Sequence, residues 1–120
     1  MSQEILKAAK QGNEKLLISL FNEESNSSIN NQDENGWTAL MFASLNNHIT
    51  CVEILLNAGA KLDITNKDFD TAWHIAHHYG LFGVQEVLDI AWDKYEQEKL
   101  DKRNNTTAYY EYAKPPKLKL

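Results

Sequence analysis

The chain has 120 residues, of which 42% are hydrophobic and 24% are charged. This length suits one domain, and the hydrophobic content excludes an intrinsically disordered chain. Its 17 acidic residues outnumber its 12 basic ones and give a formal net charge of -5. Because phosphate binding relies on clustered Lys and Arg, we expect no nucleic-acid partner.

We expect neither a membrane partner nor export. The longest apolar runs, such as 54–56, fall far short of the ~20 residues that cross a bilayer, and charged residues interrupt the start of the chain. One cysteine, Cys51, excludes an internal disulfide and suits a reducing compartment. We therefore expect a cytoplasmic protein, with the nucleus or the peroxisome as alternatives. The terminal Lys119-Leu120 shares only its last two residues with the peroxisomal Ser-Lys-Leu signal.

An internal repeat with a period of 33 residues organises the chain. The segment Thr38–Ala43 aligns with Thr71–Ala76, and the same offset relates Ile29 to Leu62. A fainter first copy, residues 5–21, is offset by 35 residues from the second. Polar residues are interspersed among its apolar ones, which is typical of a terminal unit with one solvated side. A period in this range indicates stacked supersecondary units.

Each of the later two copies predicts a pair of helices. Thr38 and Thr71 are candidate N-caps, followed by apolar residues at three- and four-residue spacing. Turns are expected at 46–47 and 79–80. The second helix of the middle copy turns Cys51, Val52, Ile54 and Leu55 inward and ends at Gly59.

In the last copy the second helix is expected to be much longer. Its apolar residues recur at helical spacing beyond the point where the middle copy ends: Val84, Val87, Leu88, Ala91, Trp92 and Tyr95. The charged continuation to Arg103 predicts a solvated extension that ends at Asn104-Asn105. Residues 104–120 form a basic tail with three tyrosines and a Pro pair. Three lysines against one glutamate give this tail a charge of +2. Because the whole chain carries -5, residues 1–103 carry -7.

The Thr-x-x-His-x-Ala start, the Leu55-Leu56 end of the second helix and the following Asn-Ala-Gly-Ala resemble the ankyrin repeat. The resemblance implies an all-α ankyrin-repeat solenoid of helix-turn-helix units in residues 1–103. Its repeats are about 3–28, 29–61 and 62–92, and the capping helix extends to 103. In the third copy Phe69 stands where the repeat has Gly and Gln85 where an apolar residue is usual, so a less regular finger is expected.

In this family the finger tips and the outward side of each first helix form a concave binding face. Nine residues of this sequence fall at those places in the repeat, and we expect them to contact a partner protein: Trp37, Phe42, Leu45, Asn46, Phe69, Asp70, Ile75, His78 and Tyr79. Lys7, Lys10 and Gln11 continue the face in the first copy. Aromatic side chains gathered on one side are typical of an interaction site. In the alternative, Phe42, Leu45 and Phe69 pack against each other or under the tail.

We expect no metal, no cofactor and no catalytic residue. His74, His77 and His78 share one helical turn, but two imidazoles without a further ligand do not hold zinc. The resemblance gives His74 a local hydrogen bond and places His77 at an inward small-residue position. Cys51 is expected to be an inert core thiol. Neither a phosphate-binding Gly-rich loop nor a nucleophile motif occurs in the sequence.

The predicted function is non-catalytic protein binding by a monomeric adaptor, scaffold or inhibitor with an unidentified partner. One alternative is a regulatory or targeting segment allied to an enzyme, because Glu34–Met41 is similar to the ankyrin segment of peroxisomal NADH diphosphatases. Another is self-association through the projecting helix. The basic tail is either solvated or folded back onto the acidic, aromatic face, where it would compete with the partner.

Overall fold

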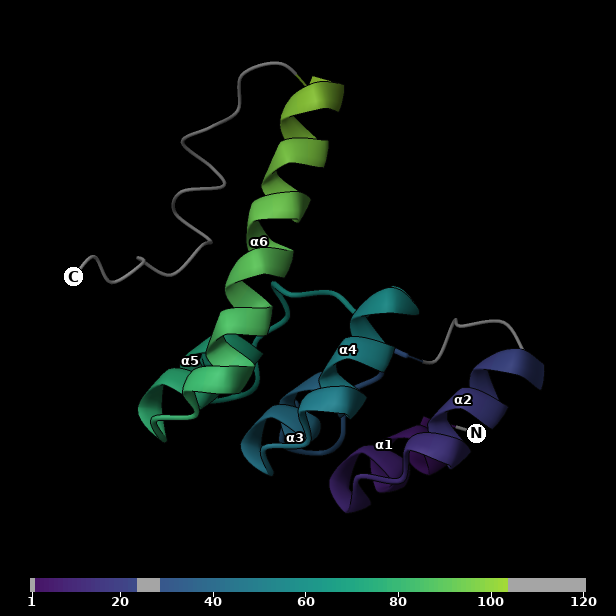
Figure 1. The fold of residues 1–120 in the computed structure, drawn as a ribbon. Coiled ribbons are helices and arrows are strands. Elements are labelled where there is room, and N and C mark those ends of the chain that lie inside the picture. The colour runs from purple at the N-terminus through teal and green to yellow at the C-terminus, as the bar shows by residue number, and fades with distance from the viewer. Residues whose placement is uncertain (1, 24–28, 104–120) are drawn as a thin grey trace.

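The computed structural model describes residues 2–23 and 29–103, and within these ranges the chain is all-α (Figure 1). The helices are α1 (Ser2–Gln11), α2 (Glu14–Glu23), α3 (Ala39–Leu45), α4 (Ile49–Asn57), α5 (Ala72–His78) and α6 (Phe82–Arg103). They form three consecutive antiparallel hairpins that lie side by side, as Figure 1 shows. The expected solenoid of helix-turn-helix units is confirmed.

Two layers of helices build the stack. The first helices of the hairpins, α1, α3 and α5, pack on one another in sequence, and α2, α4 and α6 do the same in the second layer. Small side chains line the first layer, and the following alanines are 0 to 2% exposed: Ala8, Ala9, Ala39, Ala43, Ala72 and Ala76. Their small size lets the helices approach closely, while larger residues such as Leu17, Leu55 and Leu88 fill the space between the layers.

The three hairpin turns have the same backbone structure. Gly12, Asn47 and Gly80 adopt positive φ of 73°, 60° and 67° at equivalent positions. In each turn the amide of the next residue donates to the carbonyl of Ala8, Ala43 or Ala76 at 2.9 Å. This bond satisfies a carbonyl in the last helical turn and is typical of a Schellman motif. The predicted turns at 46–47 and 79–80 are therefore confirmed.

Thr38 and Thr71 cap the first helices as predicted. Each side-chain oxygen accepts from a backbone amide three residues on, at 3.3 Å from the nitrogen of Met41 or His74. In α5 the cap is reciprocal, because the Nδ1 atom of His74 accepts from the amide of Thr71 at 3.3 Å. The local hydrogen bond expected of His74 is thus present and completes a capping box.

The fingers, the turns before α3 (residues 33–37) and before α5 (residues 66–70), are closely similar, so the expectation of a less regular third finger is wrong. In the middle copy the Asp33 carboxylate accepts from two amides and the Asp33 amide donates to the carbonyl of Trp37 at 2.9 Å. Asn66 makes the same set of bonds in the last copy, with its amide 3.0 Å from the carbonyl of Asp70. Phe69 adopts the left-handed conformation, φ 67°, that Gly36 has in the preceding finger.

Hydrogen bonds also join the two fingers. The Gln32 side-chain amide donates to the carbonyl of Gly36 at 2.8 Å and to that of Thr65 at 2.9 Å. The Lys67 amide donates to the carbonyl of Asn35 at 3.0 Å. The fingers therefore form a connected layer beside the helices.

Helix α6 is the longest helix of the described residues and confirms the predicted extension. The 33-residue offset places Trp92 where the middle copy has Gly59, whose φ of 104° ends α4. Without that stop the helix continues, and the Trp92 side chain is 1% exposed. The Tyr95 hydroxyl donates to the Asp63 carboxylate at 3.2 Å. The expected stop at Asn104-Asn105 and the tail lie outside the described residues.

We expect Trp92→Ala to lower the free energy of unfolding by about 3–5 kcal/mol, because it removes a fully buried aromatic ring from the last hairpin. Phe82→Ala is the matched control on the same helix, since the Phe82 side chain is 76% exposed and its loss should change stability by less than ~0.5 kcal/mol. Urea denaturation followed by circular dichroism measures both. Equal stability of the two variants would show that the extension does not hold the last hairpin in place.

Candidate protein-binding face

Eight of the nine residues predicted for the binding face reach the surface. Phe69, Asn46, His78 and Tyr79 are exposed, while Trp37, Phe42, Leu45 and Asp70 are half-buried. They come from the two fingers, from α3 and from the turns that follow α3 and α5. The face is therefore built by the fingers and the first-layer helices.

Ile75 is the exception, and its assignment to the face is wrong. Its side chain is 4% exposed and belongs to the core. Its counterpart in the middle copy, Phe42, is held at the surface by stacking on Trp37. In the last copy Asp70 replaces Trp37, so the stacked pair is not repeated and Ile75 packs inward.

An aromatic pair with a cation forms the centre of the face. The rings of Trp37 and Phe42 stack with centroids 5.0 Å apart, and the Lys10 Nζ atom lies 4.6 Å from the centroid of Phe42. The Asn46 side-chain amide donates to the Lys10 carbonyl at 3.3 Å. The first and second units thus meet here. The pair also packs against the core, so both rings are only partly exposed.

Phe69 is the most exposed large apolar side chain of the described residues, at 81%. It lies at the tip of the last finger with φ 67°, a conformation that costs a residue with a side chain roughly 1–2 kcal/mol. Its packing against Phe42 or Leu45, considered from the sequence, is excluded by this exposure.

Gly36 shows why a side chain fits only in the last finger. A Cβ atom at Gly36 would lie 2.9 Å from the Cα of Asn66 and 3.0 Å from the Lys67 amide nitrogen, both in the following finger. Within the described residues no finger follows the one that carries Phe69. The end of the stack therefore accommodates an aromatic residue that the middle of the stack would exclude.

His78 and Tyr79 form a separate group at the far end of α5. Their rings meet edge to face with centroids 4.8 Å apart, and Tyr79 is 60% exposed. The seven residues of α5, about 10 Å of helix, separate this group from the finger at Phe69. The aromatic residues thus occupy separate positions along the face rather than one continuous stripe.

The prediction that His77 points inward is also wrong, because its side chain is exposed. Its counterpart Ser44 is fully buried. No helix stacks beyond α5 in the described residues, so the His77 imidazole lies on Trp73 instead, with centroids 4.8 Å apart. The Gln85 side chain contacts its Nδ1 atom at 3.3 Å.

Cys51 is buried as expected, at 1% exposure. Burial, with a smaller contribution from the nearby negative charge of Glu14, raises the pKa of the Cys51 thiol above its usual range. The neutral thiol therefore predominates at neutral pH, and the side chain fills space in the core. Among the described residues, no three His, Cys, Asp or Glu side chains are grouped as they would be to hold a metal ion.

Two exposed apolar residues on α6 were not anticipated from the sequence. Phe82 is 76% exposed and Ile90 is 64% exposed. The 33-residue offset contained a signal for Ile90 only, because it corresponds to Asn57, a polar residue; Phe82 corresponds to the apolar Ile49, which the structure shows to be exposed as well. Neither residue belongs to the predicted face.

The comparison with protein families agrees with the fold. The family model described as ankyrin repeats in three copies matches residues 5–102. The chain belongs to the ankyrin-repeat family.

The curated relatives are larger proteins that share this region. Over 67 residues the chain is 42% identical to the NAD-capped RNA hydrolase NUDT12 of Homo sapiens, a match that covers 56% of this chain and 14% of that protein. Over 61 residues it is 48% identical to cortactin-binding protein 2 of Mus musculus, covering 51% of this chain and 4% of that protein. The matches thus span a small part of each relative.

A solved structure shares the arrangement of the helices. One chain of the complex between the predatory endopeptidase Bd0816 of Bdellovibrio bacteriovorus and the immunity protein Bd3460 superposes with a TM-score of 0.67 at 30% identity. The match covers 73% of this chain and 45% of that one. None of the helices described here is both long and apolar enough to cross a membrane.

Phe69→Gly should raise the free energy of unfolding by about 0.5–1 kcal/mol. The substitution removes the strain of a left-handed backbone at a residue with a side chain, and it loses little packing because the ring is exposed. The greater freedom of glycine in the unfolded chain offsets part of this gain. Gly36→Ala is the reverse case and should cost about 2 kcal/mol or more, because its Cβ would meet the next finger. Chemical denaturation measures both, and a destabilised Phe69→Gly variant would show that the ring is held by packing.

Proposed function

We propose that this chain is a non-catalytic protein-binding module, an adaptor, scaffold or inhibitor, that binds a partner protein on the face of its fingers and first-layer helices. The observation that carries the proposal is Phe69, an 81% exposed aromatic ring held at a finger tip in a strained backbone conformation. Strain that is retained beside an exposed anchor residue points to a binding role.

The rest of the face supports the same function. Trp37 and Tyr79 are the residue types that most often anchor protein interfaces, and they offer an apolar ring together with a polar atom. Hydrogen bonds join the two fingers to each other, and Thr38 and Thr71 cap α3 and α5. Together these bonds fix the backbone that carries Trp37 and Tyr79. A rigid surface loses little conformational entropy on association. We expect the chain to be a monomer when it binds.

Phe69 and Tyr79 are the best residues for testing the face, because both are exposed and neither is buried in the core. Immobilised wild-type chain is used to capture partners from a cell lysate, and the affinity of a purified partner is then measured by calorimetry. Phe69→Gly and Tyr79→Ala should each weaken binding by about 30-fold, equivalent to roughly 2 kcal/mol. Phe69→Gly should do so while the fold becomes more stable, which separates binding from folding.

Ile18→Ala is the control, since Ile18 is an apolar residue of the second layer with an exposed fraction of 47%, away from the fingers. Its partner affinity should equal that of the wild type. If partners bind all three variants with wild-type affinity, the face is not the binding site and the proposal is wrong.

A second function, regulation or targeting of an enzyme, is favoured by the 42% identity to part of NUDT12, a hydrolase of NAD-capped RNA. In this case the chain would bind the catalytic part of such a hydrolase. The test adds the purified chain to the catalytic domain and measures the hydrolysis rate and the binding. Binding, or a change in hydrolysis rate, with the wild type and not with Phe69→Gly would support this function. The absence of both binding and any rate change would contradict it.

A further inference from the structure

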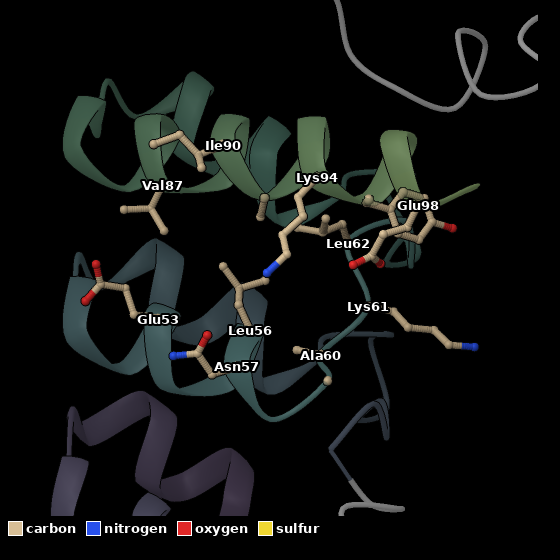
Figure 2. Close-up of a pocket in the computed structure, with 13 residues that line it drawn as sticks. Glu53, Leu56, Asn57, Ala60, Lys61, Leu62, Val87, Ile90, Lys94 and Glu98 are labelled. Atoms are coloured by element: carbon tan, nitrogen blue, oxygen red, sulfur yellow. The ribbon is translucent and has the colours of Figure 1, made fainter. Parts of the chain in front are cut away.

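A groove separates α4 from α6 in the second layer (Figure 2). None of its lining residues belongs to the proposed binding face. Its cavity volume is about 590 Å³. Apolar side chains form its floor and walls: Leu56, Leu62, Val87, Ile90 and Ala91. Charged side chains surround them, and Figure 2 shows Lys94 reaching from α6 toward α4 beside Leu56.

The groove arises from the unequal lengths of the two helices. At its closed end α4 and α6 are in contact, since a Cβ at Gly83 would lie 2.9 Å from the Cδ1 of Ile49. At the other end α4 stops at Asn57 while α6 continues to Arg103. The connection after Gly59 contributes Ala60, Lys61 and Leu62 to the lining, and the apolar sides of both helices stay partly uncovered. Ile90, on the wall of the groove, is 64% exposed.

We propose that the chain's own C-terminal tail, residues 104–120, occupies this groove. The tail follows directly after Arg103, and Glu98, only five residues earlier, already lines the groove. The distance along α6 from Arg103 back to Val87 is about 24 Å at 1.5 Å per residue. The 17 residues of the tail span up to ~56 Å when extended. The tail is therefore long enough to reverse direction and run the whole length of the groove.

The residue types of the tail, and their order along it, match the groove. The groove from Glu98 to Val87 is about 16 Å long, which five extended residues span. The segment Tyr109–Ala113 has this length, and in an extended chain Tyr110 and Tyr112 point together to one side, toward the apolar floor, while Tyr109 and Glu111 point to the other. The positions before it, including Asn104-Asn105, tolerate the left-handed conformations that a reversal requires.

The charges also complement each other. Glu111, within the tyrosine segment, would face Lys94 in the middle of the groove. The lysines that follow the segment would reach Glu53 on α4, on the opposite wall. The tail carries +2 and residues 1–103 carry -7, so the general electrostatic attraction has the same sign. Because the tail is tethered, its effective concentration at the groove is of millimolar order, and weak contacts are sufficient.

The experiment compares two full-length chains by methyl NMR: the wild type and a variant with Tyr109→Ser, Tyr110→Ser and Tyr112→Ser. Docking predicts shifts for the methyl groups of Leu56, Val87 and Ile90 and unchanged signals for Leu45 and Ile18. Shifts at Leu45 without shifts in the groove would place the tail on the binding face, and unchanged signals throughout would show that the tail docks nowhere. Either result overturns the proposal.

A substitution in the groove provides the reciprocal measurement. In full-length chains labelled with fluorotyrosine, Ile90→Asp should reduce the docked population of the tail at least about tenfold, because the carboxylate would lie among apolar side chains. Ile18→Asp is the matched control, an exposed isoleucine of the same helical layer, and should leave the tail signals unchanged. Both positions are exposed, so both variants should keep the thermal stability of the wild type. Equal tail signals in Ile90→Asp and wild type would refute docking.

Dilution of the protein shows whether the tail in the groove belongs to the same chain or to a second copy. Tail signals that do not change between millimolar and micromolar protein, with a monomeric mass, support docking within one chain. Signals that revert on dilution, together with a dimeric mass at high concentration, would assign the groove to a second copy and overturn the proposal. The tyrosine variant should still bind a partner on the finger face, so the proposed function can fail or hold independently.

Discussion

Each helical hairpin of this protein buries its apolar surface only against its neighbours in the stack, and the other features of the structure depend on this constraint. The first layer achieves it with alanines, which bring α1, α3 and α5 close together. Similar turns, built on positive φ at Gly12, Asn47 and Gly80, join the two helices of every hairpin. A repeat that packs only on the next repeat requires such uniformity, because one altered turn would displace all the units after it.

The departures from the repeat occur where this neighbour packing ends. Within the described residues, no unit stacks on α5, and there His77 is exposed while its counterpart Ser44 is buried. Phe69 is the counterpart of Gly36 in the preceding finger. Position 36 requires glycine because the next finger approaches it closely, whereas position 69 has no such neighbour in the described residues. Helix α6 continues past the position of Gly59 and covers the last hairpin with Trp92. The loss of a neighbour thus supplies the exposed aromatic residue of the proposed binding face, whereas the groove follows from the extension of α6 beyond the end of α4.

The sequence predicted the regular part of the fold well, because a 33-residue period, the caps at Thr38 and Thr71 and the turn residues are local signals. It did not predict which residues reach the surface at the end of the stack. Ile75 was assigned to the face by its helical register, yet register does not report whether an aromatic neighbour holds the side chain outward, as Trp37 does for Phe42. The groove depends on how far two helices diverge, a relation between elements that no local pattern contains.

The buried indole of Trp92 also bears on how the molecule opens. A linear stack loses its units from the ends, and the two ends of this one are fastened differently. At one end the buried Trp92 ring and the hydrogen bond from Tyr95 to Asp63 hold the long helix α6 on the last unit. At the other, the polar contacts between α1 and the second unit are exposed hydrogen bonds to the carbonyl of Lys10. Amide protons of α1 and α2 should therefore exchange with solvent before those of α5 and α6, and transient opening has a direction along the chain.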